Sequence, residues 1–278
     1  MRGKGLRLAV TLLTVIPWRG TADDATSGGY TAPSRAVSPP GAAAAMAWAP
    51  VVGLLLGVAA SAVLLLADHL LGAGPLTASV LAVGSLALLT RGLHLDGLAD
   101  LADGLASGKP APAALDIMRR PDIGALGVVT LVLTLLLQVA ALSQAESAGH
   151  SRGPAALIAA VVTGRLAITW GCRRGVPAAR PDGLGALVAG SVRPVVAAAA
   201  SVVTLAAAAA AAAIWSAVTG GAPGWTLPLA VAAGLSVAFA VQRHAVRRLG
   251  GVTGDVLGAL AEIAMTVTLV IAAMGPPA

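Results

Sequence analysis

The sequence predicts an all-α, polytopic membrane helix bundle, with about seven transmembrane helices and an N-terminal interfacial or re-entrant helix. The chain has 278 residues, of which 57% are hydrophobic and 11% are charged, whereas soluble domains carry about 25% charged residues. Its mean hydropathy is +0.87. The apolar residues form continuous runs of about 20, the length that spans a bilayer as a helix. They do not alternate with polar residues as they would in a β-barrel.

The composition excludes several other classes of protein. Aromatic residues make up only 3% of the chain, so few side chains are available to stack on nucleic-acid bases. The single cysteine, Cys172, cannot form an internal disulfide. The net charge is +6, but the basic residues lie between apolar runs and not in one patch. We therefore expect a chain surrounded by membrane lipid, with no nucleic-acid partner.

The first element is expected within residues 1–41. A basic start is followed by apolar Leu6–Ile16, which is similar to a signal peptide, but no clear small-residue cleavage site follows. The tripeptide Pro17-Trp18-Arg19 is typical of a stop at the membrane interface. We therefore predict an interfacial or re-entrant helix. A flexible connection should follow over Thr21–Pro40, which is rich in Ser, Gly and Pro.

Seven apolar runs follow as candidate spans. They are Ala42–Ala67, Leu76–Leu93, Ile123–Leu142, Pro154–Trp170, Val195–Val218, Leu227–Val241 and Val256–Met274. The sixth run is short, and its helix is allowed to continue past Gln242. Gly53 and Gly57 form a small-xxx-small pair, as do Gly254 and Gly258, and such pairs favour close helix contacts. The alternative is that they are ordinary small residues in a chain with 34 glycines.

Basic residues occur in alternate connecting segments, which fixes the expected topology. The basic segments contain Arg2, Lys4, Arg7, Arg19 and Arg35; Arg91, Lys109, Arg119 and Arg120; Arg173, Arg174, Arg180 and Arg193; and Arg243, Arg247 and Arg248. The intervening segments contain Arg152 alone. The positive-inside rule then places the N-terminus inside and the C-terminus outside. We predict one multi-pass domain over residues 1–278 in the cell (inner or cytoplasmic) membrane, with residues 91–122 as a cytoplasmic acidic loop.

The main chemical signal is a concentration of acidic residues in this loop. Of twelve Asp and Glu residues, five lie between Asp96 and Asp122. Asp96, Asp100 and Asp103 are spaced i, i+4 and i+7, so on a helix they share one face. A divalent cation would remove their repulsion, and Mg²⁺ prefers oxygen ligands and is completed by substrate phosphates. We predict these three residues as Mg²⁺ ligands; the alternative is a solvated acidic helix face.

His94 and the first two of these acids are also candidates for proton transfer. Asp96, Asp100 or His94 could accept a hydroxyl proton from a substrate. For His94, a structural hydrogen bond at the membrane boundary is the alternative.

Two further clusters follow the acidic helix. Arg119 and Arg120 stand beside a carboxylate and suit a phosphate held between a cation and guanidinium groups; the alternative is that they only anchor the loop inside. In the last span, Gly254 opens a helix with Asp255, and Glu262 is seven residues further on. An ionisable group within a span is a functional-site hypothesis by default, and pairing for packing is the alternative.

Arg165 is the one basic residue deep within an apolar run. We expect it to face the interior of the bundle. It could pair with Glu262 or Asp255, or contact a substrate phosphate.

These motifs resemble a known family. Gly92-Leu-His-Leu-Asp-Gly-Leu-Ala-Asp-Leu-Ala-Asp-Gly104, then Ile117-Met118-Arg119, and Leu249-Gly-Gly-Val-Thr-Gly-Asp-Val-Leu-Gly-Ala-Leu-Ala-Glu262 are similar to the signatures of the cobalamin synthase (adenosylcobinamide-GDP ribazoletransferase) family. The resemblance covers most of the chain. In one place the chain departs from the family: Arg120-Pro121-Asp122 replaces a usual Asp-Ser-Arg, so the roles of Arg120 and Asp122 do not carry over directly.

The resemblance implies an integral inner-membrane transferase that uses Mg²⁺. It implies attack by a ribose hydroxyl of α-ribazole, or of its 5′-phosphate, on adenosylcobinamide-GDP. The products would be GMP and adenosylcobalamin or its 5′-phosphate. Asp96, Asp100 and Asp103 would then bind the metal, and Arg119 and Arg165 the phosphates. The sequence leaves open a homo-oligomer.

Two alternatives stay open, and the second belongs to a different class of protein. A Mg²⁺-dependent membrane phosphotransferase of the CDP-alcohol type would have an arginine in the stretch that follows Asp96-Gly97, where this chain has none. A secondary transporter would suit the charges of Arg165 and Glu262, but no internal repeat is evident, and the acid cluster lies in a loop.

Overall fold

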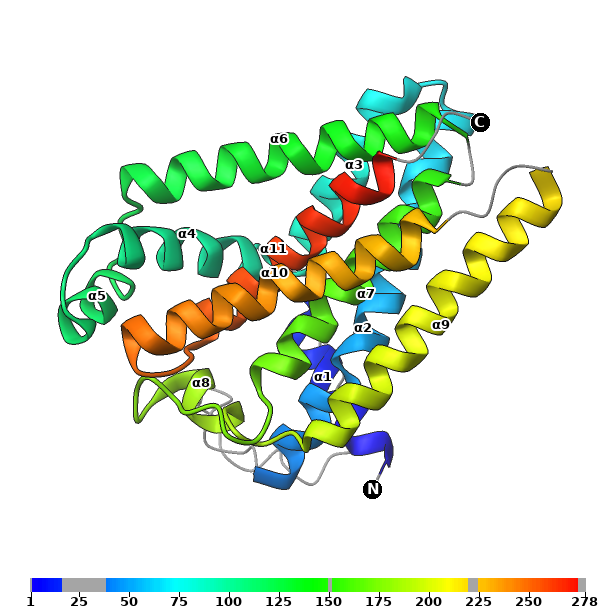
Figure 1. Ribbon diagram of the computed structural model, residues 1–278. Helices are drawn as coiled ribbons and strands as arrows, with labels where there is room; N and C mark the ends of the chain where they lie inside the picture. The colour runs from blue at the N-terminus through cyan, green and yellow to red at the C-terminus, as the bar shows by residue number, and fades with distance from the viewer. Residues whose placement is uncertain (1, 17–38, 150–151, 220–224, 275–278) are drawn as a thin grey trace, which may run out of the picture.

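The computed structural model describes residues 2–16, 39–149, 152–219 and 225–274. Within them the chain is helical (Figure 1), apart from turns and two isolated β-bridges. The predicted all-α class is therefore confirmed. Most of the flexible connection predicted over Thr21–Pro40 lies outside the described residues.

The described helices follow one another in a bundle. They are α1 (Arg2–Leu13), α2 (Pro39–Leu65), the short π-helix η3 (Leu66–Leu70), α3 (Gly74–Leu89), α4 (Leu93–Ala106), α5 (Ala111–Ile117), α6 (Ala125–Ser147), α7 (Arg152–Gly171), α8 (Gly183–Val188), α9 (Pro194–Thr219), α10 (Thr226–Leu249) and α11 (Gly254–Ala273). In the described chain, six helices are long and apolar enough to cross a membrane: α2, α6, α7, α9, α10 and α11. These make it a multi-pass membrane protein.

The seventh predicted span, Leu76–Leu93, is shorter in the structure than expected. α3 ends at Leu89 and qualifies as a span only together with α4, from which it is bent by 87°. The bend occurs at Arg91 and Gly92, whose φ angles are 52° and 66°. These left-handed conformations stop the helix and redirect the chain. Because of this bend α4 does not continue through the same layer, and it lies along one end of the bundle.

The sixth span shows the opposite deviation. α10 runs to Leu249 and so continues past Gln242, as the sequence allowed. It ends at Gly250, which has a φ of 83° and donates its N–H to the carbonyl of Val246. A glycine in this left-handed conformation is a common helix stop.

α7 and α11 form the centre of the bundle, and their neighbours approach closely at glycines. A Cβ on Gly53 of α2 would lie 2.9 Å from the carbonyl oxygen of Val161, and one on Gly57 would lie 3.0 Å from the Cα of Ile158. The predicted close contact at this glycine pair is confirmed. Such backbone-to-backbone packing, which needs small residues, is typical of membrane helices.

α1 is a short helix that packs against α2 through Ala9, Val10 and Leu13, all buried. Just after it, the N–H of Val15 donates to the carbonyl of Leu89 at the end of α3, at 2.8 Å. The N-terminal helix is therefore joined to the α3–α4 bend. Its position at a membrane interface stays a prediction.

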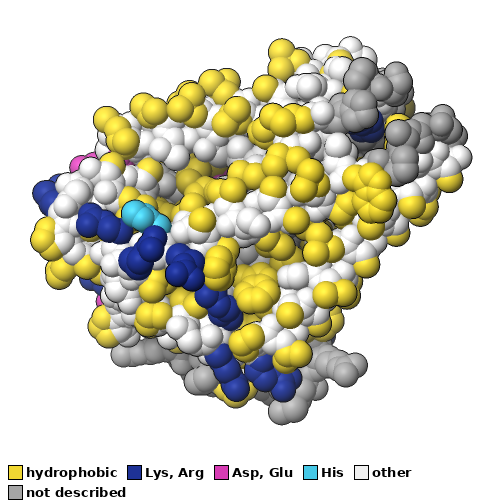
Figure 2. All heavy atoms as spheres, in the orientation of Figure 1, with side chains coloured by type: hydrophobic (Ala, Val, Ile, Leu, Met, Phe, Trp, Pro, Cys, Tyr) yellow, Lys and Arg dark blue, Asp and Glu magenta, His cyan; other side chains and the backbone are white. Residues whose placement is uncertain are grey.

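We call one end of the bundle the site end: it contains α4, α5, α8 and the turn between α10 and α11. The opposite end contains η3 and the end of α6. Among the described basic residues after the α3–α4 bend, Arg152 is at the opposite end and Arg165 is buried within α7, whereas the others belong to the site end. Figure 2 shows a band of Lys and Arg side chains that borders a broad apolar surface.

Candidate active site at the contact of α4 and α11

Two glycines bring α4 against the start of α11. A Cβ on Gly97 would lie 2.7 Å from the carbonyl oxygen of Asp255, and one on Gly258 would lie 3.1 Å from the Cα of His94. Both distances are shorter than an ordinary van der Waals contact. Only hydrogen at these positions lets the two helices pack this closely, so the glycines set the spacing between the acids of α4 and those of α11.

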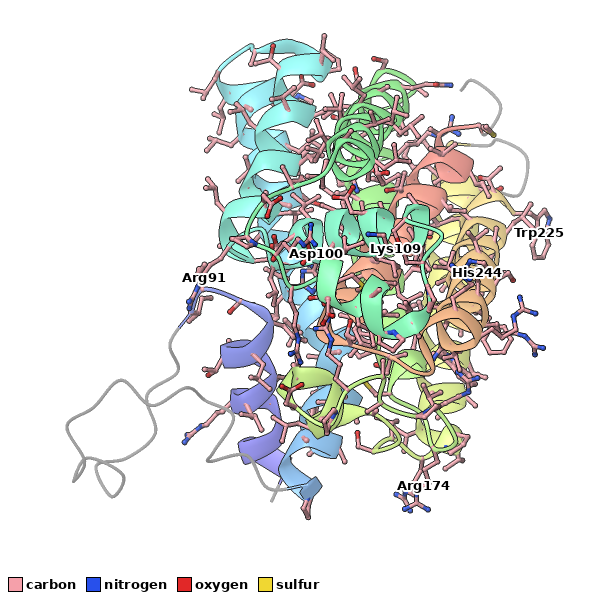
Figure 3. The ribbon with its side chains drawn as sticks, turned by 90° about the vertical axis from the view of Figure 1, so that its left-hand side faces the viewer. Arg91, Asp100, Lys109, Arg174, Trp225 and His244 are labelled. Atoms are coloured by element: carbon pink, nitrogen blue, oxygen red, sulfur yellow. The ribbon has the colours of Figure 1, made fainter. Side chains whose placement is uncertain are left out.

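The acids of α4 face the solvent and the start of α11. Asp96 is exposed and Asp100 is half-buried, and Figure 3 shows Asp100 on the side of the molecule formed by α4 and α5. Burial, the largest cause, and the neighbouring carboxylates of Asp255, Asp96 and Asp103 together raise the pKa of Asp100 to about 7, against the opposing effect of Arg180. The cluster therefore concentrates negative charge that a bound cation would relieve.

Asp103, the third predicted metal ligand, makes a different set of contacts. Its Oδ2 accepts the N–H of Gly124 at 2.7 Å, and its Oδ1 accepts the N–H of Gly127 at 2.8 Å. These donors are at the start of α6, where backbone N–H groups lack partners within the helix. Asp103 therefore caps α6 from α4, and its role as a metal ligand stays a prediction.

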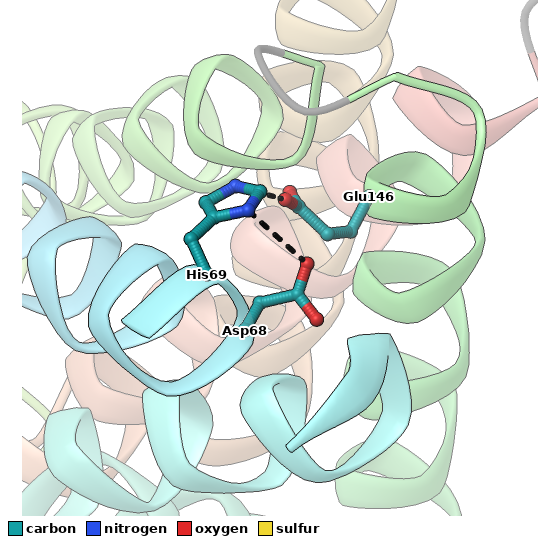
Figure 4. A group of neighbouring side chains, drawn as sticks. All are labelled: Asp68, His69 and Glu146. Atoms are coloured by element: carbon teal, nitrogen blue, oxygen red, sulfur yellow. Dashed lines mark ion pairs between the residues drawn. The ribbon is translucent and has the colours of Figure 1, made fainter. Parts of the chain in front are cut away.

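The carboxylates of α4 and α11 are not gathered tightly. In the described residues, the one group of three side chains whose ligand atoms lie within 4.8 Å of one another is at the opposite end: Asp68, His69 and Glu146 (Figure 4). There the imidazole lies 4.0 Å from Asp68 and 3.8 Å from Glu146, which links η3 to α6 when His69 is protonated. The wider spacing at the site end fits Mg²⁺, which needs only one or two carboxylates besides substrate phosphates.

A cavity of about 250 Å³ lies beside the acidic cluster. Three residues predicted from the sequence line it: His94, Gly254 and Asp255. His94 is 2% exposed, and neither ring nitrogen has a hydrogen-bond partner in the part of the chain that the structure describes. Burial, together with nearby Arg165, lowers the pKa of His94 well below its ordinary value, so the ring is neutral. A neutral imidazole without a partner at the wall of a cavity is poised to bond a substrate group.

Asp255 is held at the start of α11 by Thr253. The Thr253 hydroxyl accepts the N–H of Val256 at 3.2 Å and donates to the Asp255 carboxylate at 3.1 Å. This is a helix N-cap. It orients the carboxylate toward the cavity and toward α4.

The structure adds Arg180 and Asp182, which were not among the predicted site residues. Both line the cavity. The Arg180 guanidinium lies 3.8 Å from the Asp255 carboxylate and donates to the carbonyl of Leu115 at 2.6 Å, while its Nε is buried without a partner. Their signal in the sequence was the segment Arg180-Pro-Asp-Gly, an acid and a base beside glycines on the same predicted side of the membrane.

The two arginines predicted to bind phosphate differ in their contacts. Arg119 forms an ion pair with Asp182, with 2.6 Å between Nη2 and Oδ1, and so lies at the rim of the cavity. Arg120 is exposed. Because the Arg119 side chain is 50% exposed, this pair contributes little to stability and leaves the guanidinium accessible.

Glu262 and Arg165 lie deeper in the bundle than the cavity. Glu262 accepts a hydrogen bond from Gln138 at 2.9 Å, and the same amide nitrogen donates to Thr266 at 2.9 Å. Arg165 is 1% exposed, and its Nε and Nη1 have no hydrogen-bond partner among the described residues. In the described residues Arg165 has no carboxylate within 4.0 Å, so neither of the pairs predicted for it is formed directly.

A small cavity of about 10 Å³ is lined by Thr90, Gln138, Arg165 and Glu262, among others. This is about the room that one water needs. Arg165 and Glu262 therefore line the same small cavity within the bundle. Neither residue lines the larger cavity, and both roles as substrate-binding residues stay predictions.

The fold and the site together define a polytopic helical membrane protein with an acidic, arginine-lined site at one end. Residues 5–273 match the sequence profile of a family described as cobalamin-5-phosphate synthase. The chain therefore belongs to the cobalamin-5-phosphate synthase family.

Proteins similar to this chain over nearly its whole length have names that agree with this family. The chain is 44% identical to the adenosylcobinamide-GDP ribazoletransferase of Frankia casuarinae, over 98% of this chain and 95% of the relative. It is 37% identical to that of a Nocardioides species, over 95% of each chain. It is 36% identical to that of Corynebacterium efficiens, over 98% of this chain and 91% of the relative. No solved structure matches the chain.

These matches confirm the family resemblance deduced from the sequence motifs. They favour it over the two alternatives, a CDP-alcohol phosphotransferase and a secondary transporter.

Proposed function

We propose that this chain joins adenosylcobinamide-GDP to α-ribazole or α-ribazole 5′-phosphate, and that the reaction takes place at the site end. The family membership supports the overall reaction. The observation that carries the location is the cavity bounded by neutral His94, Asp255 and Arg180, beside the acids of α4.

In this reaction a ribose hydroxyl oxygen forms a bond to the phosphorus that carries the corrinoid. The bond from that phosphorus to the bridging oxygen of GMP breaks, and the hydroxyl proton leaves. The products are adenosylcobalamin, or its 5′-phosphate, and GMP. Negative charge develops on the phosphoryl oxygens and on the leaving phosphate, so the enzyme must supply positive charge and a proton acceptor.

The residues at the site end are suited to these tasks. Arg180 and Arg119 would contact the diphosphate, Arg180 from the cavity wall and Arg119 from its rim. His94 or an acid of α4 would accept the hydroxyl proton, since the unpartnered imidazole is neutral and lines the cavity.

Asp96 and Asp100 are the residues that would hold Mg²⁺, and Asp255 faces them from α11. Three observations support this: the donors are all oxygens, the acids repel one another, and the pKa of Asp100 is raised. When bound, Mg²⁺ would neutralise charge on the diphosphate. Asp103 is the weakest candidate, since both of its oxygens already accept N–H groups of α6.

The protein is proposed to lie in the cell (inner) membrane with the site end in the cytoplasm. The support is the distribution of arginine and lysine, which favours the site end and leaves Arg152 at the other. In this orientation the site faces the compartment that supplies nucleotides.

The test is GMP release from purified protein in lipid, with adenosylcobinamide-GDP and α-ribazole supplied together. We expect release only when both substrates and Mg²⁺ are present. Asp96→Ala and Asp100→Ala should each lower the rate by about 10²- to 10³-fold, while Asp116→Ala, an exposed acid on α5, should leave it unchanged. GMP release by either α4 variant near the wild-type rate would rule out the metal assignment.

A further inference from the structure

A second, larger cavity lies away from the candidate active site. It has a volume of about 510 Å³ and is formed by side chains of α7, α9, α10 and α11, including Trp170, Ser201, Phe239 and Leu260. None of its lining residues lines the cavity that contains His94. It is therefore a separate groove, which we call the α9–α10 groove.

Most of the groove wall is apolar, and it lies among membrane-spanning helices. α9 is one of the spans that is least buried within the bundle, so this side faces the surrounding lipid. Phe239 is 40% exposed, and the face of α10 and α9 in Figure 2 is largely hydrophobic. The groove could therefore hold an apolar chain.

The groove also has a cationic mouth near the site end. The guanidinium carbon of Arg173 lies 5.9 Å from the centre of the Trp170 ring and 4.9 Å from that of Phe239. The guanidinium of Arg243 lies 6.0 Å from the same Phe239 ring. Gln242 accepts a hydrogen bond from Arg173 Nη1 at 2.7 Å. Stacking and this hydrogen bond fix the orientation of the Arg173 head group.

Neither arginine has an acidic partner among the described residues. In the described chain no carboxylate lies within 4.0 Å of Arg173 or Arg243. Within the described residues the hydrogen bonds of Arg173 all use Nη1, so Nε and Nη2 remain available as donors. Burial and the charge of Arg243 lower the pKa of the Arg173 guanidinium. Arg173 and Arg243 are two neighbouring cations at one aromatic ring, and a bound anion would reduce the repulsion between them.

We propose that the α9–α10 groove binds one anionic phospholipid, with its phosphate on Arg173 and Arg243 and an acyl chain in the groove. Ser201 and Gln242 are each seven residues from the site end of their helix, which is about 10 Å along a helix. This depth is close to the boundary between head groups and acyl chains. Basic pockets between transmembrane helices are typical sites for anionic head groups.

The test is native mass spectrometry of the full-length protein in detergent, titrated with phosphatidylglycerol or phosphatidylcholine. We expect one phosphatidylglycerol to bind at least about tenfold more tightly than phosphatidylcholine. Arg173→Gln and Arg243→Gln should each weaken phosphatidylglycerol binding about tenfold. Arg247→Gln is the matched control, because Arg247 is exposed on the same helix and its guanidinium lies over no aromatic ring of the described chain; it should bind like wild type.

Further measurements separate the lipid from other sources of the same chemistry. Ser236→Trp would fill the groove while keeping both arginines, and it should also weaken phosphatidylglycerol binding. Inorganic phosphate at the same concentration should not displace the lipid. Equal binding of the two lipids, loss in Arg247→Gln equal to that in Arg243→Gln, or displacement by phosphate alone would each overturn the proposal. If Arg173→Gln does not fold, Arg243→Gln decides, because Arg243 is exposed and its guanidinium lies at the edge of the groove, 6.0 Å from the centre of the Phe239 ring.

Discussion

Gly97→Ala is the substitution that tests most sharply whether the spacing of α4 and α11 matters for activity. The new Cβ would lie 2.7 Å from the Asp255 carbonyl oxygen and 2.8 Å from its Cα. An ordinary contact needs about 3.5 Å. One helix must therefore move by about 0.7–0.8 Å, which separates Asp96 and Asp100 from Asp255.

A shift of this size has two expected consequences. Overpacking costs about 1–3 kcal/mol of stability. Misplacement of a site by about 1 Å can cost about 10²-fold in rate. We expect GMP release per folded molecule to fall by about 10²-fold, with the helical circular dichroism spectrum retained.

Two other alanine substitutions are matched controls. Gly84→Ala, on the exposed side of α3, meets nothing within 4 Å and should change neither stability nor rate. Gly57→Ala creates a close contact between α2 and α7, away from the acids, and should lower stability while keeping the rate per folded molecule. If Gly97→Ala releases GMP at the rate of Gly57→Ala, the proposed link between helix spacing and catalysis is wrong.

Three further predictions concern stability and pH. Asp103→Ala should lower the free energy of unfolding by about 1–2 kcal/mol, since the N–H groups of Gly124 and Gly127 lose their acceptors. Denaturation in detergent would measure this loss. An unchanged denaturation midpoint would refute the role of Asp103 as a helix cap. Because the pKa of Asp100 is raised from its ordinary value of 3.8 to about 7, the metal-free protein should lose stability as pH rises from about 4 to about 7. Asp100→Asn should lose less stability over the same pH range. If Tm depends equally on pH in both proteins, Asp100 is not the source of the loss. Glu262→Gln keeps the acceptor for Gln138 but removes the carboxyl group near buried Arg165. It should therefore lower both Tm and the rate of GMP release. If Tm falls and the rate per folded molecule does not, Glu262 serves packing alone.

Much of the fold follows from the sequence because membrane spans depend on local composition. Each apolar run of about 20 residues forms a helix, since every backbone group must be satisfied within the lipid. The bend between α3 and α4 could not be predicted in the same way. It uses a left-handed Arg91, and arginine has no sequence preference for that conformation.

The candidate site could be predicted only where its residues are close together in the sequence. Asp96 and Asp100 share a helix face, so their proximity is visible in the spacing alone. The contacts of Asp103, by contrast, are with residues 21 and 24 positions further along the chain, and they depend on how α6 docks against α4. Arg180 and Asp182 join the site from the segment after α7, and the ion pair of Asp182 with Arg119 spans 63 positions. Periodicity carries no signal for such contacts.

We propose that the acids of α4 beside α11 carry the reaction. The most direct test is GMP release by Asp100→Ala compared with Asp116→Ala, in the same lipid and with saturating Mg²⁺, adenosylcobinamide-GDP and α-ribazole. We expect Asp116→Ala to be fully active and Asp100→Ala to be slower by about 10²- to 10³-fold. Equal rates for the two variants would contradict it.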